Sequence, residues 1–251
     1  MLRELGIVVP SPSPALAPEN HPLNRSAMNH LKHASALLGL IALQLIPIAC
    51  KDKTPPPPPG AAVPTPPSPP LDAASPESFR VKFVTTKGDF TVEVTRAWAP
   101  KGADRFYRLV TEGYFKDISF FRVLPGFMAQ FGASGNPELN ERMASLQIPD
   151  DPVTQSNKRG MVTFAMAGPN TRSNQFFINY GDNARLDSQG FPPFGKVVDG
   201  MKAVDAMYGG YGEGAPNGLG PSQDSVAAKG NEYLQRAFPK LDYIKSATIM
   251  K

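Results

Sequence analysis

From residue 79 onward, apolar residues alternate with polar ones in short runs that are separated by turn-forming residues. Period-two alternation on both sides of Lys87-Gly88-Asp89 is typical of a β-hairpin. The inward side chains of this predicted hairpin are Val81, Phe83, Phe90, Val92 and Val94.

The pattern changes to helical spacing in three places. A helix is predicted to open at Pro100, which suits a first helical turn, and to close at Gly113. Two further helices are predicted over Met201–Met207 and Ser225–Ala237. Residues 133–159 are polar and irregular, and they predict a long loop.

The remaining apolar runs are short and favour strands. Phe120–Gly132 predicts two strands joined at Pro125-Gly126. Further strands are expected at Met161–Ala167, Gln175–Asn179, Phe194–Val198 and Tyr243–Ile249. Many short strands with few helices, and without alternation of strand and helix, indicate an antiparallel barrel or sandwich.

The 28 prolines of the 251-residue chain are unevenly spread, and this unevenness predicts the domain boundaries. Residues 1–27 are expected to be disordered or a non-native extension, and residues 28–50 a signal segment. Residues 51–78 hold eleven prolines and predict a semi-rigid linker. Residues 79–251 form the expected globular domain.

Cysteine and histidine are confined to the first fifty residues. Cys50 is the single cysteine, and the three histidines all precede residue 34. The globular region therefore cannot use Ser-His or Cys-His catalysis, and we expect no metal site there. The net charge of +4 comes from scattered residues, so no nucleic-acid partner is expected. The Gly-rich Tyr208–Gly220 stretch lacks the spacing of a phosphate-binding loop.

One arginine, Arg122, stands among large apolar side chains within Phe120–Gly132. Taken alone, this stretch fits two interpretations equally well: a pair of core strands with an arginine at the edge, and a site in which Arg122 has a chemical role. The surrounding segments are needed to decide between a structural and a chemical role.

Four further segments continue in order beyond Phe120–Gly132, namely Phe164–Thr171, Asn174–Asn179, Leu186-Asp187 and Phe194–Met201. With these segments, residues 79–251 resemble a cyclophilin-type peptidyl-prolyl cis-trans isomerase. The resemblance implies a mainly β fold, a closed eight-stranded antiparallel barrel with two or three capping helices.

The resemblance also implies a site, matched residue by residue. Arg122 would be the catalytic arginine. The proline pocket and the groove for the flanking peptide would be formed by Phe127, Met128, Gln130, Ala165, Gln175, Phe177, Leu186 and Phe191. No cofactor is implied.

Three positions depart from the family's pattern. Phe121 and Phe191 stand where many members have histidines, and Arg185 replaces a tryptophan that contacts cyclosporin. We therefore expect weak binding of cyclosporin.

The expected activity is cis-trans isomerisation of X-Pro bonds during the folding of exported proteins. The rotating C–N bond has partial double-bond character, and its barrier is about 18–20 kcal/mol. No bond breaks, so a guanidinium that donates to the prolyl nitrogen in an apolar pocket suffices. Two alternatives stay open: a chaperone or scaffold module that binds proline-containing polypeptides with little turnover, and a structural envelope protein.

A basic stretch from Asn29 is followed by the apolar run Ala34–Ala49 and then by Cys50. Ile48-Ala49-Cys50 resembles the end of a bacterial lipoprotein signal, which implies lipid attachment at Cys50. Under the sorting rule of such proteins, Lys51 favours the outer membrane over the inner one, so we expect the chain to be anchored on the periplasmic side of the envelope. We also expect the protein to be monomeric. The alternative is an uncleaved anchor with an incidental cysteine.

Replacing Cys50 with serine tests the lipid anchor. If Cys50 carries lipid, the expressed wild-type chain partitions into the detergent phase and Cys50→Ser moves to the aqueous phase, because acyl chains supply the membrane affinity. Detergent phase separation measures the distribution. Equal partitioning of the two proteins would refute lipidation.

Overall fold

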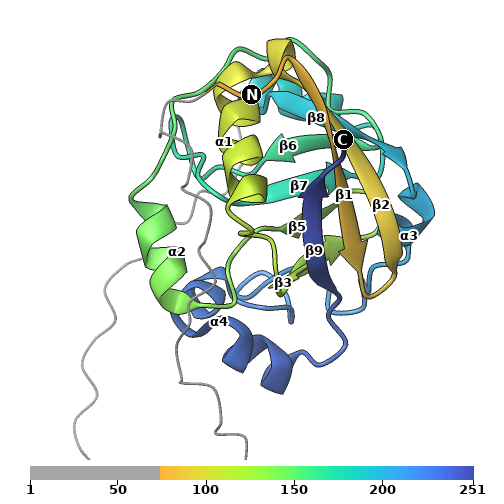
Figure 1. Ribbon diagram of the computed structural model, residues 1–251. Coiled ribbons are helices and arrows are strands. Elements are labelled where there is room, and N and C mark those ends of the chain that lie inside the picture. The colour runs from red at the N-terminus through yellow and green to blue at the C-terminus, as the bar shows by residue number, and fades with distance from the viewer. Residues whose placement is uncertain (1–73) are drawn as a thin grey trace, which may run out of the picture. The chain divides into compact units, whose positions relative to one another are not determined.

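The computed structural model describes residues 74–251 (Figure 1). The expectations for residues 1–27, for 28–50 and for 51–73 of the proline-rich segment lie outside the described residues. The strands are β1 (Ser78–Thr85), β2 (Gly88–Thr95), β3 (Ile118–Ser119), β4 (Arg122–Leu124), β5 (Met128–Phe131), β6 (Met161–Phe164), β7 (Phe176–Asn179), β8 (Pro193–Asp199) and β9 (Tyr243–Ile249). The helices are α1 (Pro100–Thr111), α2 (Pro137–Ala144), α3 (Met201–Asp205) and α4 (Gln223–Ala237), with short 3₁₀ helices at Arg96–Trp98 and Ala184–Gln189.

All nine strands belong to one antiparallel sheet with the order β3-β9-β1-β2-β8-β6-β7-β5-β4. The two edge strands, β3 and β4, are separated in the chain only by Phe120-Phe121. Because two residues span only a few ångströms, the sheet must curl until its edges lie close together. The expected mainly β, antiparallel architecture is confirmed.

The strand count and the closure differ from the expected eight-stranded closed barrel. Nine strands are present because Phe120-Phe121 belongs to no strand and divides one bent segment into β3 and β4. Within residues 74–251, no ladder joins these two strands, so the chain itself connects the edges.

Phenylalanine rings fill the space that the sheet encloses. Phe176 of β7 lies at the centre, with its ring centroid 4.4 Å from that of Phe164 and 5.6 Å from that of Phe131. Phe106 brings α1 onto this core, at 5.3 Å from Phe176. Helix α1 contacts β8 and β9. Figure 1 shows α2 beside α4 at the lower end.

Helix α1 has the predicted start and end. Pro100 occupies the first helical turn, and Gly113 follows the helix with φ of +70°. The carboxylate of Asp151 accepts hydrogen bonds from the backbone N–H groups of Lys101 and Gly102, at 3.1 and 2.9 Å. A remote side chain thus satisfies donors that a helix start leaves unpaired.

The expectation of a continuous loop over 133–159 was wrong, because helix α2 lies within it. The side chain of Asn136 accepts from the backbone N–H of Glu138 at 2.9 Å, and Pro137 follows as the first helical residue. The described chain therefore has four α-helices instead of two or three. Only Asn140 and Met143 are buried in α2, so its apolar pattern is too sparse to predict it.

Helix α4 covers a second, smaller apolar cluster, in which Phe121 is 1% exposed. Val226 and Leu234 of α4 belong to it, with Ala133 and Leu241. The helix bends at Gly230, where a Cβ would lie 2.0 Å from the carbonyl oxygen of Gly135. Glycine at this position allows α4 to approach the chain before α2 closely.

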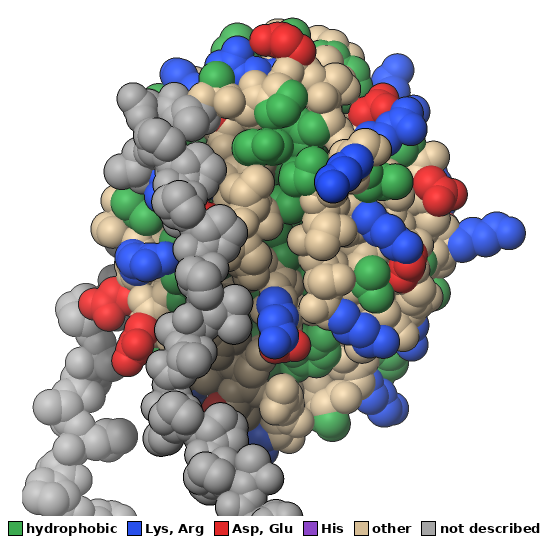
Figure 2. All heavy atoms as spheres, viewed as in Figure 1, with side chains coloured by type: hydrophobic (Ala, Val, Ile, Leu, Met, Phe, Trp, Pro, Cys, Tyr) green, Lys and Arg blue, Asp and Glu red, His purple; other side chains and the backbone are tan. Residues whose placement is uncertain are grey.

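The outer face of the β1–β2 hairpin carries ion pairs, Arg80–Glu93 at 2.7 Å and Lys82–Asp89 at 2.8 Å. Figure 2 shows basic side chains dispersed over one face of the molecule, several of them beside acidic ones. None of the helices within residues 74–251 has the length and apolar character that crossing a membrane requires.

Truncating Phe121 is expected to destabilise the protein strongly. Phe121→Ala should lower the free energy of unfolding by about 3–5 kcal/mol, because it leaves a cavity between the sheet and α4. Phe127→Ala, at a partly buried ring, is the matched control and should cost clearly less. Urea unfolding measures both variants, and equal losses would contradict the role of Phe121 as an anchor for α4.

Candidate functional site

The register of three neighbouring strands brings Arg122, Gln130 and Phe177 together. Arg122 of β4 pairs with Gln130 of β5, and Gln130 pairs with Phe177 of β7. Directly paired residues project from the same face of a sheet, so these side chains form a row across the outer face. Their chain neighbours Val123 and Phe131 point to the opposite face and join the core.

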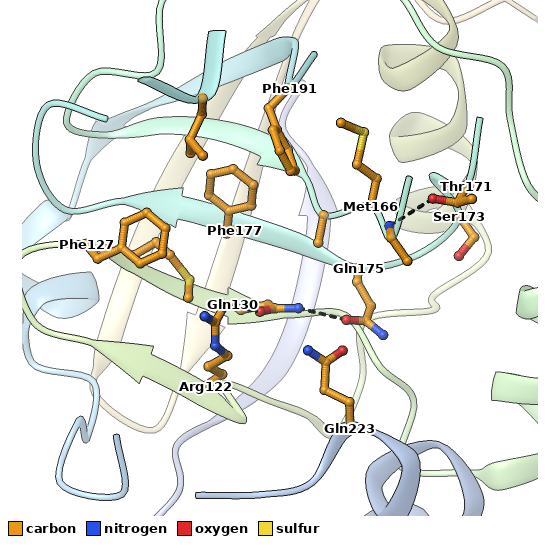
Figure 3. Close-up of a pocket in the computed structure, with 14 residues that line it drawn as sticks. Arg122, Phe127, Gln130, Met166, Thr171, Ser173, Gln175, Phe177, Phe191 and Gln223 are labelled. Atoms are coloured by element: carbon orange, nitrogen blue, oxygen red, sulfur yellow. Dashed lines mark hydrogen bonds between the residues drawn. The ribbon is translucent and has the colours of Figure 1, made fainter. Parts of the chain in front are cut away.

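A pocket of about 460 Å³ opens over this row (Figure 3). All nine residues that the sequence nominated line it, which are Arg122, Phe127, Met128, Gln130, Ala165, Gln175, Phe177, Leu186 and Phe191. Their placement around one pocket is a finding, whereas their roles stay predictions.

One end of the pocket is apolar. Met128, Phe177 and Leu186 are buried and pack together. The ring of Phe191 meets that of Phe177 edge to face, with centroids 6.0 Å apart. Figure 3 shows Phe127, Phe177 and Phe191 facing this end, with Arg122 below them. The arrangement suits a small apolar ring, since these five large side chains form apolar walls that exclude water.

Buried Asn157 holds the segment that supplies Leu186 and Phe191. Its side chain amide donates to Asp187 and to the carbonyl of Phe191, each at 2.8 Å. Its own backbone N–H donates to Asp187 at 2.9 Å. These bonds fix the 3₁₀ helix at Ala184–Gln189 beside the sheet, and with it this wall of the pocket.

The other end of the pocket is more polar and is built by the loop between β6 and β7. Thr171 and Ser173 line it, and they flank Arg172, whose side chain is fully buried. The guanidinium of Arg172 donates to Asp151 at 3.1 Å and to Asp150 at 3.2 Å. This buried ion pair ties the loop to the start of α1.

Arg122 is held by a chain of polar contacts. Its Nε and Nη2 atoms donate to the two carboxylate oxygens of Glu213, both at 2.6 Å. Its Nη1 donates to Gln130 at 3.0 Å, and Gln130 donates to Gln175 at 2.9 Å. The hydrogen bond from Arg122 lowers the pKa of Glu213 below its ordinary value, because it stabilises the charged carboxylate.

Within residues 74–251, no group of three or more His, Cys, Asp or Glu side chains is arranged to hold a metal ion. The polar side chains at the pocket instead carry amide, guanidinium and hydroxyl groups, which can hydrogen-bond a peptide backbone.

Comparison with known proteins supplies the family. The family model described as "Cyclophilin type peptidyl-prolyl cis-trans isomerase/CLD" matches residues 80–218, more than half of the chain. The chain belongs to the cyclophilin family of peptidyl-prolyl isomerases. Enzymes of this family catalyse the reaction of class EC 5.2.1.8.

Individual relatives agree with the family match. "Peptidyl-prolyl cis-trans isomerase-like 3" of Mus musculus is 34% identical over 130 residues, 51% of this chain and 80% of its own length. A "Probable peptidyl-prolyl cis-trans isomerase" of Brucella abortus is 34% identical over 165 residues, 61% of this chain and 82% of its own. A crystal structure of a cyclophilin type isomerase from Cryptosporidium parvum covers 69% of this chain and 98% of its own, with a TM-score of 0.51 and 22% identity. That structure supports the fold.

The departures from the cyclophilin pattern have physical explanations. Phe121 stands where a histidine was expected, and it is buried under α4 instead of facing the pocket. Arg185 replaces the expected tryptophan, and its guanidinium carbon lies 4.7 Å from the centroid of the Phe127 ring. A cation–π contact therefore supports the pocket ring at this position.

Sequence reasoning missed several residues of the pocket. Met166, Ala167 and Thr171 lie within the cyclophilin-like segment Phe164–Thr171, so the pattern could have nominated them, and Ser173 follows closely. Gln223 is the first residue of α4 and lies beyond the matched residues 80–218. Glu213 lies in the Gly-rich stretch, and only its position between two glycines distinguishes it in the sequence.

The ion pair at Glu213 predicts a pH-dependent difference in stability. Its folded pKa lies below the ordinary 4.5, so its contribution is present above that value and is lost as pH falls through the folded pKa. The excess stability of wild type over Glu213→Gln should therefore be largest near neutral pH and should shrink as the pH is lowered below the ordinary value of 4.5. Urea unfolding across this range measures it, and a constant difference would contradict the pairing.

Proposed function

We propose that this protein accelerates X-Pro isomerisation through Arg122, which donates a hydrogen bond to the prolyl nitrogen while the proline ring lies in the apolar end of the pocket. The proposal is supported mainly by the position of Arg122, which lines the pocket with Phe127, Met128 and Phe177.

The chemistry needs only a donor that favours the twisted peptide bond over both planar forms. Twisting ends the resonance of the C–N bond and localises the lone pair on nitrogen, which then accepts a hydrogen bond more readily. A guanidinium stays protonated in proteins and has rigidly placed N–H donors. A pocket with apolar walls strengthens that bond by excluding water.

The polar end of the pocket supports binding of the residues that flank proline. Gln175 and Gln130 are joined by a hydrogen bond of 2.9 Å, and Ala165 and Thr171 lie nearby in the lining. Amide side chains can donate to and accept from an extended peptide backbone. We propose proline-containing unfolded or extended polypeptides as the substrates.

Uncatalysed isomerisation takes about 10–100 s at 25 °C, which is slow enough to limit folding. We propose that the substrates are exported proteins, and that the enzyme is held by lipid on Cys50 at the periplasmic side of a bacterial envelope, with the outer membrane preferred. This part of the proposal rests on the sequence around Cys50.

Substituting Arg122 tests the mechanism. Arg122→Ala should lower kcat/KM for a proline-containing peptide by about 10²–10³-fold, the range found when one donor to a transition state is removed. Arg122→Lys should restore little, since an ammonium lacks the planar fork. Arg159→Ala removes an exposed arginine paired with Asp205 and serves as the control.

The assay also separates the proposal from its alternative. An active wild type with an equally active Arg122→Ala variant would refute the arginine mechanism. A wild type that binds proline peptides without turnover would favour a chaperone or scaffold module instead.

A further inference from the structure

The loop between α3 and α4 brings a carboxylate against the proposed catalytic arginine. Glu213 accepts from Nε and Nη2 of Arg122, one hydrogen bond to each carboxylate oxygen and both at 2.6 Å. Side chain exposures are 22% for Arg122 and 35% for Glu213, so the pair is partly shielded from water. This fork geometry fixes the plane of the guanidinium as well as its distance.

The contacts divide the donors of Arg122 into bound and unbound ones. A guanidinium has five N–H groups; Glu213 takes two and Gln130 takes one, which leaves two. Within the described residues 74–251, these two lack a partner, and there is one on each terminal nitrogen. Because the group is planar and rigid, fixing three of its N–H groups fixes the direction of the other two.

Glu213 does not itself line the pocket, although Arg122 and Gln130 do. Figure 3 shows the guanidinium of Arg122 beside Gln130 at the lower edge of the pocket. Glu213 therefore contacts the arginine without contributing to the wall that a peptide would touch. This placement favours a role that acts through Arg122.

The loop has contacts beyond those of the Glu213 side chain, whose Oε1 also accepts from the backbone N–H of Gly214 at 2.8 Å. The carbonyl of Glu213 accepts from the backbone N–H of Gly220 at 2.8 Å, and Ala215 donates to the carbonyl of Gly220 at 3.2 Å. A Cβ at Gly218 would lie 2.4 Å from the carbonyl oxygen of Glu213, so glycine permits this close turn. Tyr211, two residues before Glu213, packs on Phe238 with ring centroids 5.0 Å apart.

We propose that Glu213 is a positioning residue for the isomerase reaction, which holds the guanidinium of Arg122 so that its two remaining N–H groups face the substrate. The inference rests on the proposed function. Arginine has many rotamers, and a carboxylate that fixes its plane before substrate arrives removes the need to order it during the reaction. Loss of Glu213 should therefore reduce the stabilisation of the twisted peptide bond, because Arg122 donates its hydrogen bond in that state.

Steady-state kinetics of the full-length chain test this role. Glu213→Ala should lower kcat by about tenfold to a hundredfold, the loss expected when a catalytic group is misplaced. KM should change by less than about twofold, because binding uses the apolar pocket. Glu213→Gln should recover part of kcat, since its amide oxygen can still accept one hydrogen bond from the guanidinium.

Glu112→Ala is the matched control. It breaks an ion pair of similar burial at the end of helix α1, Arg108–Glu112 at 2.7 Å, with side chain exposures of 24% and 19%. Its kcat and KM should equal those of wild type. A general loss of stability from breaking an ion pair would lower the activity of both variants, and that result would overturn the positioning role.

The outcomes separate this inference from the proposed function. An active wild type with unchanged or increased kcat in Glu213→Ala overturns the inference and leaves the function standing. An inactive wild type refutes the function. The positioning itself is then decided by ¹⁵N NMR relaxation of the Arg122 Nε–H group, whose motion should increase in Glu213→Ala; equal motion in both proteins would overturn it.

Discussion

The antiparallel register of β4, β5 and β7 is the constraint on which the pocket depends. Side chains alternate between the two faces along each strand, so one register fixes both faces at once. It directs Val123, Phe131 and Phe176 into the core. It directs Arg122, Gln130 and Phe177 to the outer face. A slip of one residue would exchange the two sets, and the cost of exposing the core rings prevents it. Core packing thereby fixes the outer row.

The second apolar cluster adds what the sheet cannot provide. Phe121 sits in the break between β3 and β4, and it anchors α4 through Val226 and Leu234. That anchoring places Gln223 at the pocket. Tyr211 packs against the same cluster and lies two residues before Glu213, which contacts Arg122. A phenylalanine in place of a histidine thus belongs to a local rearrangement of packing next to the site.

The chemistry proposed for the site requires few kinds of residue, but it requires that they be placed accurately. Bond rotation needs one well-directed donor in a dry pocket, which a single arginine among phenylalanine, methionine and leucine side chains can provide. The direction of that donor depends on its partners, because a guanidinium on a flexible stem has no preferred orientation by itself. Glu213 and Gln130 are the partners in this protein.

The sequence by itself determined the mainly β architecture, the hairpin, the ends of α1 and the family, because period-two alternation, Pro and Gly positions and ordered motifs are local features. It also nominated nine residues that line one pocket. Only the tertiary structure decided that β3 and β4 are one bent segment, that Phe121 lies beneath α4 and that Glu213 contacts Arg122. The contact between Arg122 and Glu213 joins positions 91 residues apart in the chain, and Phe121 is still further in sequence from α4, so no local pattern records either contact.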